Sequence, residues 1–66
     1  MKYIIYKDLF GYHGTDEKNY NSPIQNKSDI CDYTDFENPE DIKAYLAKYT
    51  YLDPKNIVIV EENNHV

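Results

Sequence analysis

The 66-residue sequence contains no arginine, and this absence limits the partners that it can bind directly. Arginine is the preferred side chain for bidentate recognition of phosphate groups and of guanine edges. All seven basic residues are lysines, and twelve carboxylates outnumber them to give a formal net charge of −5. Because nucleic acid and anionic lipid repel an acidic chain, the composition argues against direct binding to DNA, RNA or a membrane surface.

Cysteine and long apolar runs are also scarce. Cys31 is the only cysteine, so no disulfide can form within the chain, and a lone thiol is typical of a reducing compartment. The apolar run from Tyr3 to Tyr6 is far shorter than the roughly 7–15 residues of a secretory signal or the ~20 of a membrane span. We therefore expect a cytoplasmic protein, in which Cys31 is a small buried side chain and not a nucleophile.

The residue types needed for metal binding or catalysis are sparse. The only imidazole and thiol groups are His13, His65 and Cys31. Their spacing does not match a zinc site, and the acidic segment lacks the pattern and the glycine of a calcium-binding loop. A chain this short can barely enclose the water-poor cleft that paired carboxylates need for acid–base chemistry. We expect no metal, no cofactor and no enzymatic activity.

Two short segments predict β-strands. Residues 2–7 are rich in β-branched and aromatic side chains on both faces, which predicts a central strand, or a strand with one face on the helix and the other on a partner. Residues 56–61 include four consecutive β-branched side chains, a pattern typical of a strand buried on both faces. Between residues 9 and 28, turn-forming residues recur every few positions, so we expect a long packed loop with a short strand near Ile24 or within residues 30–33.

One helix is predicted over residues 39–50. Asn38 is a suitable N-cap, Pro39 favours the first helical position, and the next two acidic residues oppose the helix dipole. The i, i+3, i+4, i+7 spacing predicts a buried stripe made of Ile42, Tyr45, Leu46 and Tyr49. The whole chain, residues 1–66, is thus expected to form a small α+β single domain, with this helix packed on a sheet of two to four strands that includes residues 2–7 and 56–61.

The segment Phe10-Gly11-Tyr12-His13-Gly14-Thr15-Asp16, with Ser22 and Ile24 further on, resembles the start of the ADP-ribosyltransferase fold. In that family a Tyr-His-Gly-Thr or similar tetrapeptide follows the first strand. The resemblance implies that His13 contacts the nicotinamide ribose of NAD and that Gly14 contacts the nicotinamide amide. However, the family's split sheet is much longer than this chain, and Pro23 interrupts the expected helix. A loop that uses Gly11 and Gly14 for positive φ angles is the alternative interpretation.

An acidic run lies between Lys27 and Lys43 and includes six carboxylates, two aromatic rings and no basic residue. The last two carboxylates belong to the first turn of the predicted helix. The other acidic and aromatic residues of the run are the predicted partner-binding residues: Asp29, Asp32, Tyr33, Asp35, Phe36 and Glu37. In an extended chain, residues two apart are ~7 Å apart, comparable with twice the ~3.4 Å rise per nucleotide. The carboxylates could thus occupy phosphate positions on a partner; simple solvation of the run is the alternative.

We therefore expect a small non-enzymatic binding protein that occupies the basic groove of a nucleic-acid-binding protein or nuclease. Tyrosine beside carboxylate suits a basic surface, because rings attract cations and carboxylates accept charge-assisted hydrogen bonds. Such chains are similar in type to the inhibitors that bacteriophages and other mobile elements use against host nucleases, including anti-CRISPR and anti-restriction proteins. The alternative is a structural or regulatory homo-oligomer, such as a homodimer, in which tyrosine-rich strands pair between copies.

Overall fold

The computed structural model describes residues 2–60, which form a mixed sheet with one main helix packed on it. The strands are β1 (Tyr3–Asp8), β2 (Gly11–Asp16), β3 (Cys31–Tyr33) and β4 (Ile57–Ile59), arranged in the order β3-β2-β1-β4. β2 is antiparallel to both β1 and β3, whereas β4 is parallel to β1. The predicted α+β fold is confirmed, and both predicted strands belong to this sheet, where they are neighbours.

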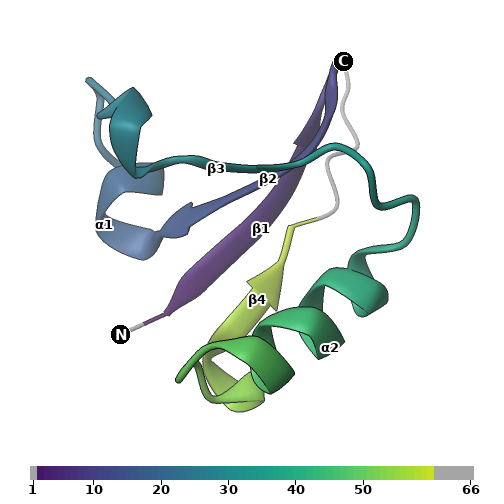
Figure 1. The fold of residues 1–66 in the computed structure, drawn as a ribbon. Helices are drawn as coiled ribbons and strands as arrows, with labels where there is room; N and C mark the ends of the chain where they lie inside the picture. Colours follow the sequence, from purple (N-terminus) through teal and green to yellow (C-terminus); the bar gives the residue numbers. More distant parts are fainter. Residues whose placement is uncertain (1, 61–66) are drawn as a thin grey trace.

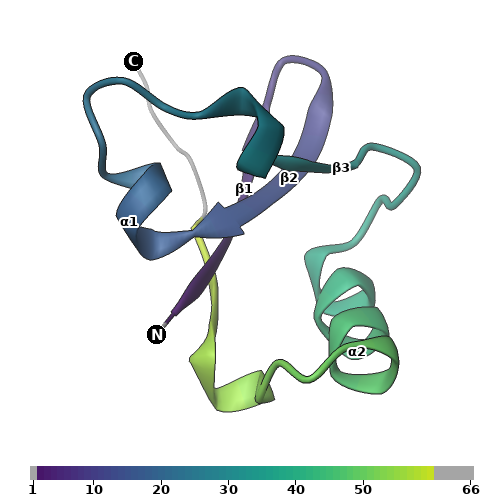
Figure 2. The same cartoon turned by 60° about the vertical axis from the view of Figure 1, so that its left-hand side comes forward.

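The helices lie on opposite sides of this sheet (Figures 1 and 2). The main helix α2 (Pro39–Tyr49) covers one face, and the short helix α1 (Glu17–Tyr20) lies on the other. The 3-10 turn η1 (Lys27–Asp29) accompanies α1, and a second turn, η2 (Pro54–Asn56), leads into β4. Each face of the sheet therefore has its own covering layer, and α2 provides the larger one.

β1 is the central strand, as its two apolar faces predict. Ile5 is fully buried under α2, and Ile4 is buried on the opposite face. β4 is instead an edge strand, in which Ile57 is buried and the next two residues are half-buried. The Val60 amide donates a 2.8 Å hydrogen bond to the Ile5 carbonyl, which extends the pairing by one step. Position 61 of the predicted strand lies outside the described residues.

α2 starts where the sequence predicts, because Asn38 Oδ1 accepts a 2.9 Å hydrogen bond from the Glu40 amide. Ile42 and Leu46 pack on the sheet as expected. The prediction that Tyr45 and Tyr49 share this buried stripe is wrong, since they are 44% and 65% exposed. The buried part of the helix is therefore limited to Ile42 and Leu46, and the two tyrosines lie on its flank, where their rings contact each other.

The prediction of a loop across residues 11–16 is also wrong, because this segment is β2. It pairs with β1 from Tyr3↔Asp16 to Asp8↔Gly11. Gly11 has a φ of 123° at the end of the turn, as predicted, but Gly14 does not have a positive φ. Gly14 is instead needed for space, because a Cβ there would lie 2.7 Å from Tyr3 Cε2. The predicted short strand within residues 30–33 is confirmed as β3.

The segment after β2 is held in place mainly by polar contacts. Asn19 is buried, and its Nδ2 donates hydrogen bonds to Thr15 Oγ1 at 2.9 Å and to the Asn26 carbonyl at 3.1 Å. Its Oδ1 accepts a 2.8 Å hydrogen bond from the Asn26 amide. Thr15 Oγ1 in turn donates to the Asp29 carbonyl at 3.1 Å. These bonds close the loop and place η1 over the sheet.

Candidate functional site

β3 divides the predicted partner-binding residues between the two faces of the sheet. Asp32 and Tyr33 are consecutive in this strand, so their side chains point in opposite directions. Asp32 contacts His13 on the face that carries α1, and exposed Asp29 lies in η1 on the same side. Tyr33 instead packs against the core beneath α2. Cys31, predicted to be buried, is exposed because β3 is a short strand at the edge of the sheet.

Asp35 and Glu37 form an acidic corner in the turn between β3 and α2. Both residues are exposed, and half-buried Phe36 lies between them in the chain. The Phe36 amide donates a 3.1 Å hydrogen bond to the Tyr33 carbonyl, which fixes this turn. Asp35, Phe36 and Glu37 thus lie in one turn, whereas Asp32 lies in β3 and bonds to His13.

Phe36 begins an aromatic row, made of Phe36, Tyr45 and Tyr49, along the exposed flank of α2. The ring centroids of Phe36 and Tyr45 are 5.7 Å apart, and those of Tyr45 and Tyr49 are 5.1 Å apart. Lys48 Nζ lies 5.3 Å from the centroid of the Tyr49 ring, so this ring already attracts a cation. The sequence did not reveal this surface, because the spacing of the two tyrosines is also that of a buried stripe.

A hairpin tip made of Leu9 and Phe10 lies beside the acidic corner. The two residues are 98% and 81% exposed, which places two large apolar side chains in solvent. Asp8 Oδ1 accepts a 2.8 Å hydrogen bond from the Phe10 amide, which helps to fix the turn. Gly11, the next residue, is so close to Thr34 that an added Cβ would lie 3.2 Å from Thr34 Cγ2. Since Thr34 directly precedes the acidic corner, the tip and the corner are neighbours.

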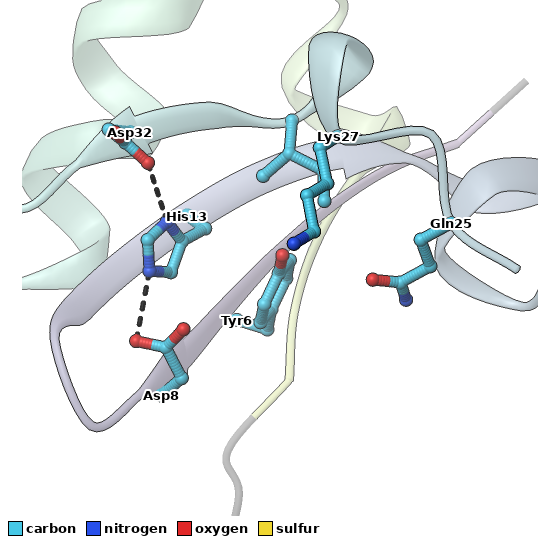
Figure 3. A pocket seen from close by; sticks show the side chains of 7 residues that line it. Tyr6, Asp8, His13, Gln25, Lys27 and Asp32 are labelled. Atoms are coloured by element: carbon cyan, nitrogen blue, oxygen red, sulfur yellow. Dashed lines mark hydrogen bonds and ion pairs between the residues drawn. The ribbon is translucent and has the colours of Figure 1, made fainter.

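On the other face, His13 lies between two carboxylates in a histidine bridge made of Asp8, His13 and Asp32 (Figure 3). Nδ1 is 2.8 Å from Asp32 Oδ1, and Nε2 is 2.9 Å from Asp8 Oδ1. The sheet register makes this possible, because it places His13 directly across from Asp32 in the neighbouring strand. The ring packs beside Tyr6, with a centroid separation of 5.6 Å.

The histidine bridge favours the charged forms of its members. Partial burial alone would lower the pKa of His13, but the hydrogen bonds and negative charges of Asp8 and Asp32 raise it above its ordinary value. Desolvation would raise the pKa of Asp8, but hydrogen bonds from the Phe10 amide and from His13 leave it below its ordinary value. Both shifts favour the ion-paired state, in which an imidazolium lies between two carboxylates.

The bridge borders an open pocket of about 390 Å³. The pocket is lined by Tyr6, Asp8, His13, Gln25, Lys27, Ile30 and Asp32. Both ring nitrogens of His13 are hydrogen-bonded to carboxylates that line this pocket. Residues 2–60 contain no cluster of three or more side chains suited to holding a metal ion.

Packing and ion pairing account for the residues that resemble the ADP-ribosyltransferase motif. Gly14 is buried beneath the rings of Tyr3 and Tyr33, and His13 belongs to the histidine bridge, so both residues have structural roles in this fold. Large exposed apolar side chains lie elsewhere, in the hairpin tip and the aromatic row, and the acidic corner carries exposed carboxylates. No helix in the described part of the chain has the length and apolarity needed to cross a bilayer. Comparisons of this chain with known protein families, curated proteins and solved structures find no match.

Proposed function

We propose that this chain is a non-enzymatic binding protein whose acidic corner and aromatic row bind a basic surface of a partner protein. The observation that carries this proposal is that exposed Asp35 and Glu37 flank Phe36 in the chain, and that the Phe36 ring contacts a row of exposed tyrosines. Carboxylates accept charge-assisted hydrogen bonds from arginine and lysine, and tyrosine rings attract the same cations. The contact between Lys48 and Tyr49 is an intramolecular example of that attraction.

The partner class that we propose is a nucleic-acid-binding protein or nuclease, whose binding groove is rich in lysine and arginine. The net charge of −5 supports electrostatic attraction to such a groove. The hairpin tip supplies apolar contact area next to the charged corner, as central anchors do in many interfaces. Occupation of the groove would make the chain an inhibitor, of the anti-CRISPR or anti-restriction type, acting in the cytoplasm. The free, exposed Cys31 fits a reducing compartment.

Charge reversal at the corner is expected to weaken binding to a hexa-arginine peptide about tenfold, because two attractive contacts become repulsive. The test compares D35K/E37K with the unmodified protein in an NMR titration. The matched control is E17K/D29K, which changes the net charge equally by replacing exposed carboxylates on the α1 side. Raising the salt concentration from about 50 mM to about 500 mM should also weaken binding, since exposed charges are screened. Equal loss in the control would reject the acidic corner as the binding site.

The inhibitory step requires a competition experiment with a purified partner. A protein captured from a cell lysate supports the proposal only if a labelled nucleic-acid duplex displaces it and if D35K/E37K fails to capture it. Size-exclusion chromatography at micromolar concentration examines the homo-oligomer alternative. A stable dimer that D35K/E37K leaves intact, with no binding of the hexa-arginine peptide, would favour that alternative over the proposed function.

A further inference from the structure

The histidine bridge connects three strands through one side chain. Asp8 belongs to β1, His13 to β2 and Asp32 to β3. β3 is the outermost strand on this side and pairs with β2 through only three residues. The bond between His13 and Asp32 lies directly across this short pairing. It therefore adds a side-chain connection at the weakest edge of the sheet.

The geometry of the bridge requires a proton. Both ring nitrogens lie within 3 Å of a carboxylate oxygen, and ionised carboxylates only accept hydrogen bonds. An imidazolium donates from both nitrogens, whereas a neutral ring donates from only one. After deprotonation, a nitrogen lone pair would face a carboxylate oxygen, so one of the two bonds must open.

The charged and titratable groups around His13 come from each element on this face. β1 contributes Asp8 and Tyr6, β3 contributes Asp32, and η1 contributes Lys27 at the rim of the shared pocket. From α1, Tyr20 reaches the ring of Tyr6, with a centroid separation of 5.3 Å. α2 lies on the opposite face of the sheet (Figure 2). Lys27 disfavours the imidazolium, but two carboxylates in direct contact with the ring outweigh one ammonium at the rim.

The two bonds of the bridge are not equivalent. Asp8 Oδ1 also accepts the Phe10 amide at 2.8 Å, so the hairpin turn holds this carboxylate in place. The Asp32 side chain is 74% exposed, and within residues 2–60 it bonds only to His13. Asp32 can turn into water at little cost when the ring becomes neutral. The bond to β3 is therefore the one that opens.

We propose that His13 is a pH-sensitive clamp that holds β3 against the sheet and releases it when the imidazolium loses its proton. Because the folded-state pKa of His13 is raised, its stabilising contribution is complete below the unfolded value of about 6.5. This contribution is lost as the pH rises through the folded-state value. At the acidic end, the lowered pKa of Asp8 means that its contribution is lost as the pH falls through that lowered value. Release of β3 thus belongs to the upper limit, which His13 sets, whereas the lower limit applies to the bond between His13 and Asp8.

Amide hydrogen exchange tests the clamp without any partner. All samples carry H65Q, so that His13 is the only titrating histidine, and NMR of its ring gives the protonated fraction. Protection of the amides between β2 and β3, corrected for intrinsic exchange rates, should fall about threefold as the ring deprotonates, as expected for an exposed ion pair. Protection of the amides between β1 and β4 should not change with the protonated fraction of the ring. Protection of β3 that is independent of ring charge would overturn the proposal.

Two substitutions separate the clamp from general loosening of the fold. H13Q should abolish the pH dependence of β3 protection. D32N keeps the bond between His13 and Asp8 and removes the charge on β3, so it gives a second test if H13Q does not fold. It should lower the pKa of the His13 ring and also abolish the pH dependence. D29N, which neutralises a neighbouring carboxylate in η1, is the control and should leave both quantities unchanged. Retention of the pH dependence in D32N would contradict the inference.

Discussion

Replacing Gly14 with alanine is expected to lower the free energy of unfolding by roughly 2–3 kcal/mol, because the added methyl group has no space. A Cβ at this position would lie 2.7 Å from Tyr3 Cε2 and 2.8 Å from Tyr33 Cε2. The rings cannot easily move apart, since their hydroxyl oxygens are 3.1 Å apart in a hydrogen bond and both rings pack against the core. Burial and the hydrogen bond with Tyr33 also raise the pKa of Tyr3.

The measurement is urea unfolding followed by circular dichroism. A domain of this length has a total stability of roughly 3–10 kcal/mol, so G14A should shift the midpoint strongly. The control is the same substitution in a Tyr3→Leu background, where two of the closest atoms are absent. The cost of G14A should be smaller there, because neighbouring substitutions that share a contact are not additive. Equal costs in the two backgrounds would show that the clash with Tyr3 is not the cause.

Replacing Asn19 with alanine should lower the free energy of unfolding by about 2–3 kcal/mol, since it leaves buried polar groups without partners. Thr15 Oγ1 would lose a donor, and Asn26 would lose partners for both its amide and its carbonyl. Apolar packing cannot compensate in this segment, because Ile24 is itself exposed. The loss should therefore be concentrated in the loop after α1.

Hydrogen exchange of the Asn26 amide, together with urea unfolding, checks this expectation. N19A should accelerate exchange at Asn26 far more than in β1, whose pairing it does not touch. Asn21→Ala is the matched control, because this asparagine is exposed and its side chain makes no hydrogen bond within the described residues. If N19A and N21A have equal effects on stability, the polar contacts of Asn19 do not hold the loop.

The boundaries of α2 could be predicted because they depend on neighbouring residues. Asn38 and Pro39 specify the start within two positions, and the cap geometry follows directly from them. β1 could be predicted as central for a similar reason, because both of its faces are apolar. Local signals of this kind do not reveal how wide the opposing surface is. For that reason Tyr45 and Tyr49 were expected to be buried and are exposed.

β2 could not be predicted because its evidence comes from other strands. Its two glycines indicate a loop when the segment is considered alone. In the fold, Gly11 ends the hairpin turn, and Gly14 makes room for rings that β1 and β3 contribute. A strand with weak local preference becomes stable when its backbone groups pair on both sides. The strand β2 therefore depends on its pairing with β1 and β3 in the tertiary structure and not on its local sequence.

In the candidate site, too, the residue types were visible in the sequence, but their positions depend on contacts between distant segments. The carboxylates of the acidic run were visible in the sequence, but their directions were not. Alternation along β3 sends Asp32 to one face and Tyr33 to the other. The histidine bridge joins residues that are 5 and 19 positions apart, so no spacing rule indicated it. The acidic corner and the aromatic row meet because the turn after β3 leads Phe36 to the flank of α2.

The sequence by itself determined the charge of this protein, the start of its main helix and its two apolar strands, because these depend on composition and on near neighbours. Only the tertiary structure decided which acidic side chains share a surface, which tyrosines reach solvent and where the imidazole finds its two carboxylates. The physical reason is that exposure and ion pairing depend on which strands become neighbours. That choice is made by backbone pairing and core packing across the whole chain.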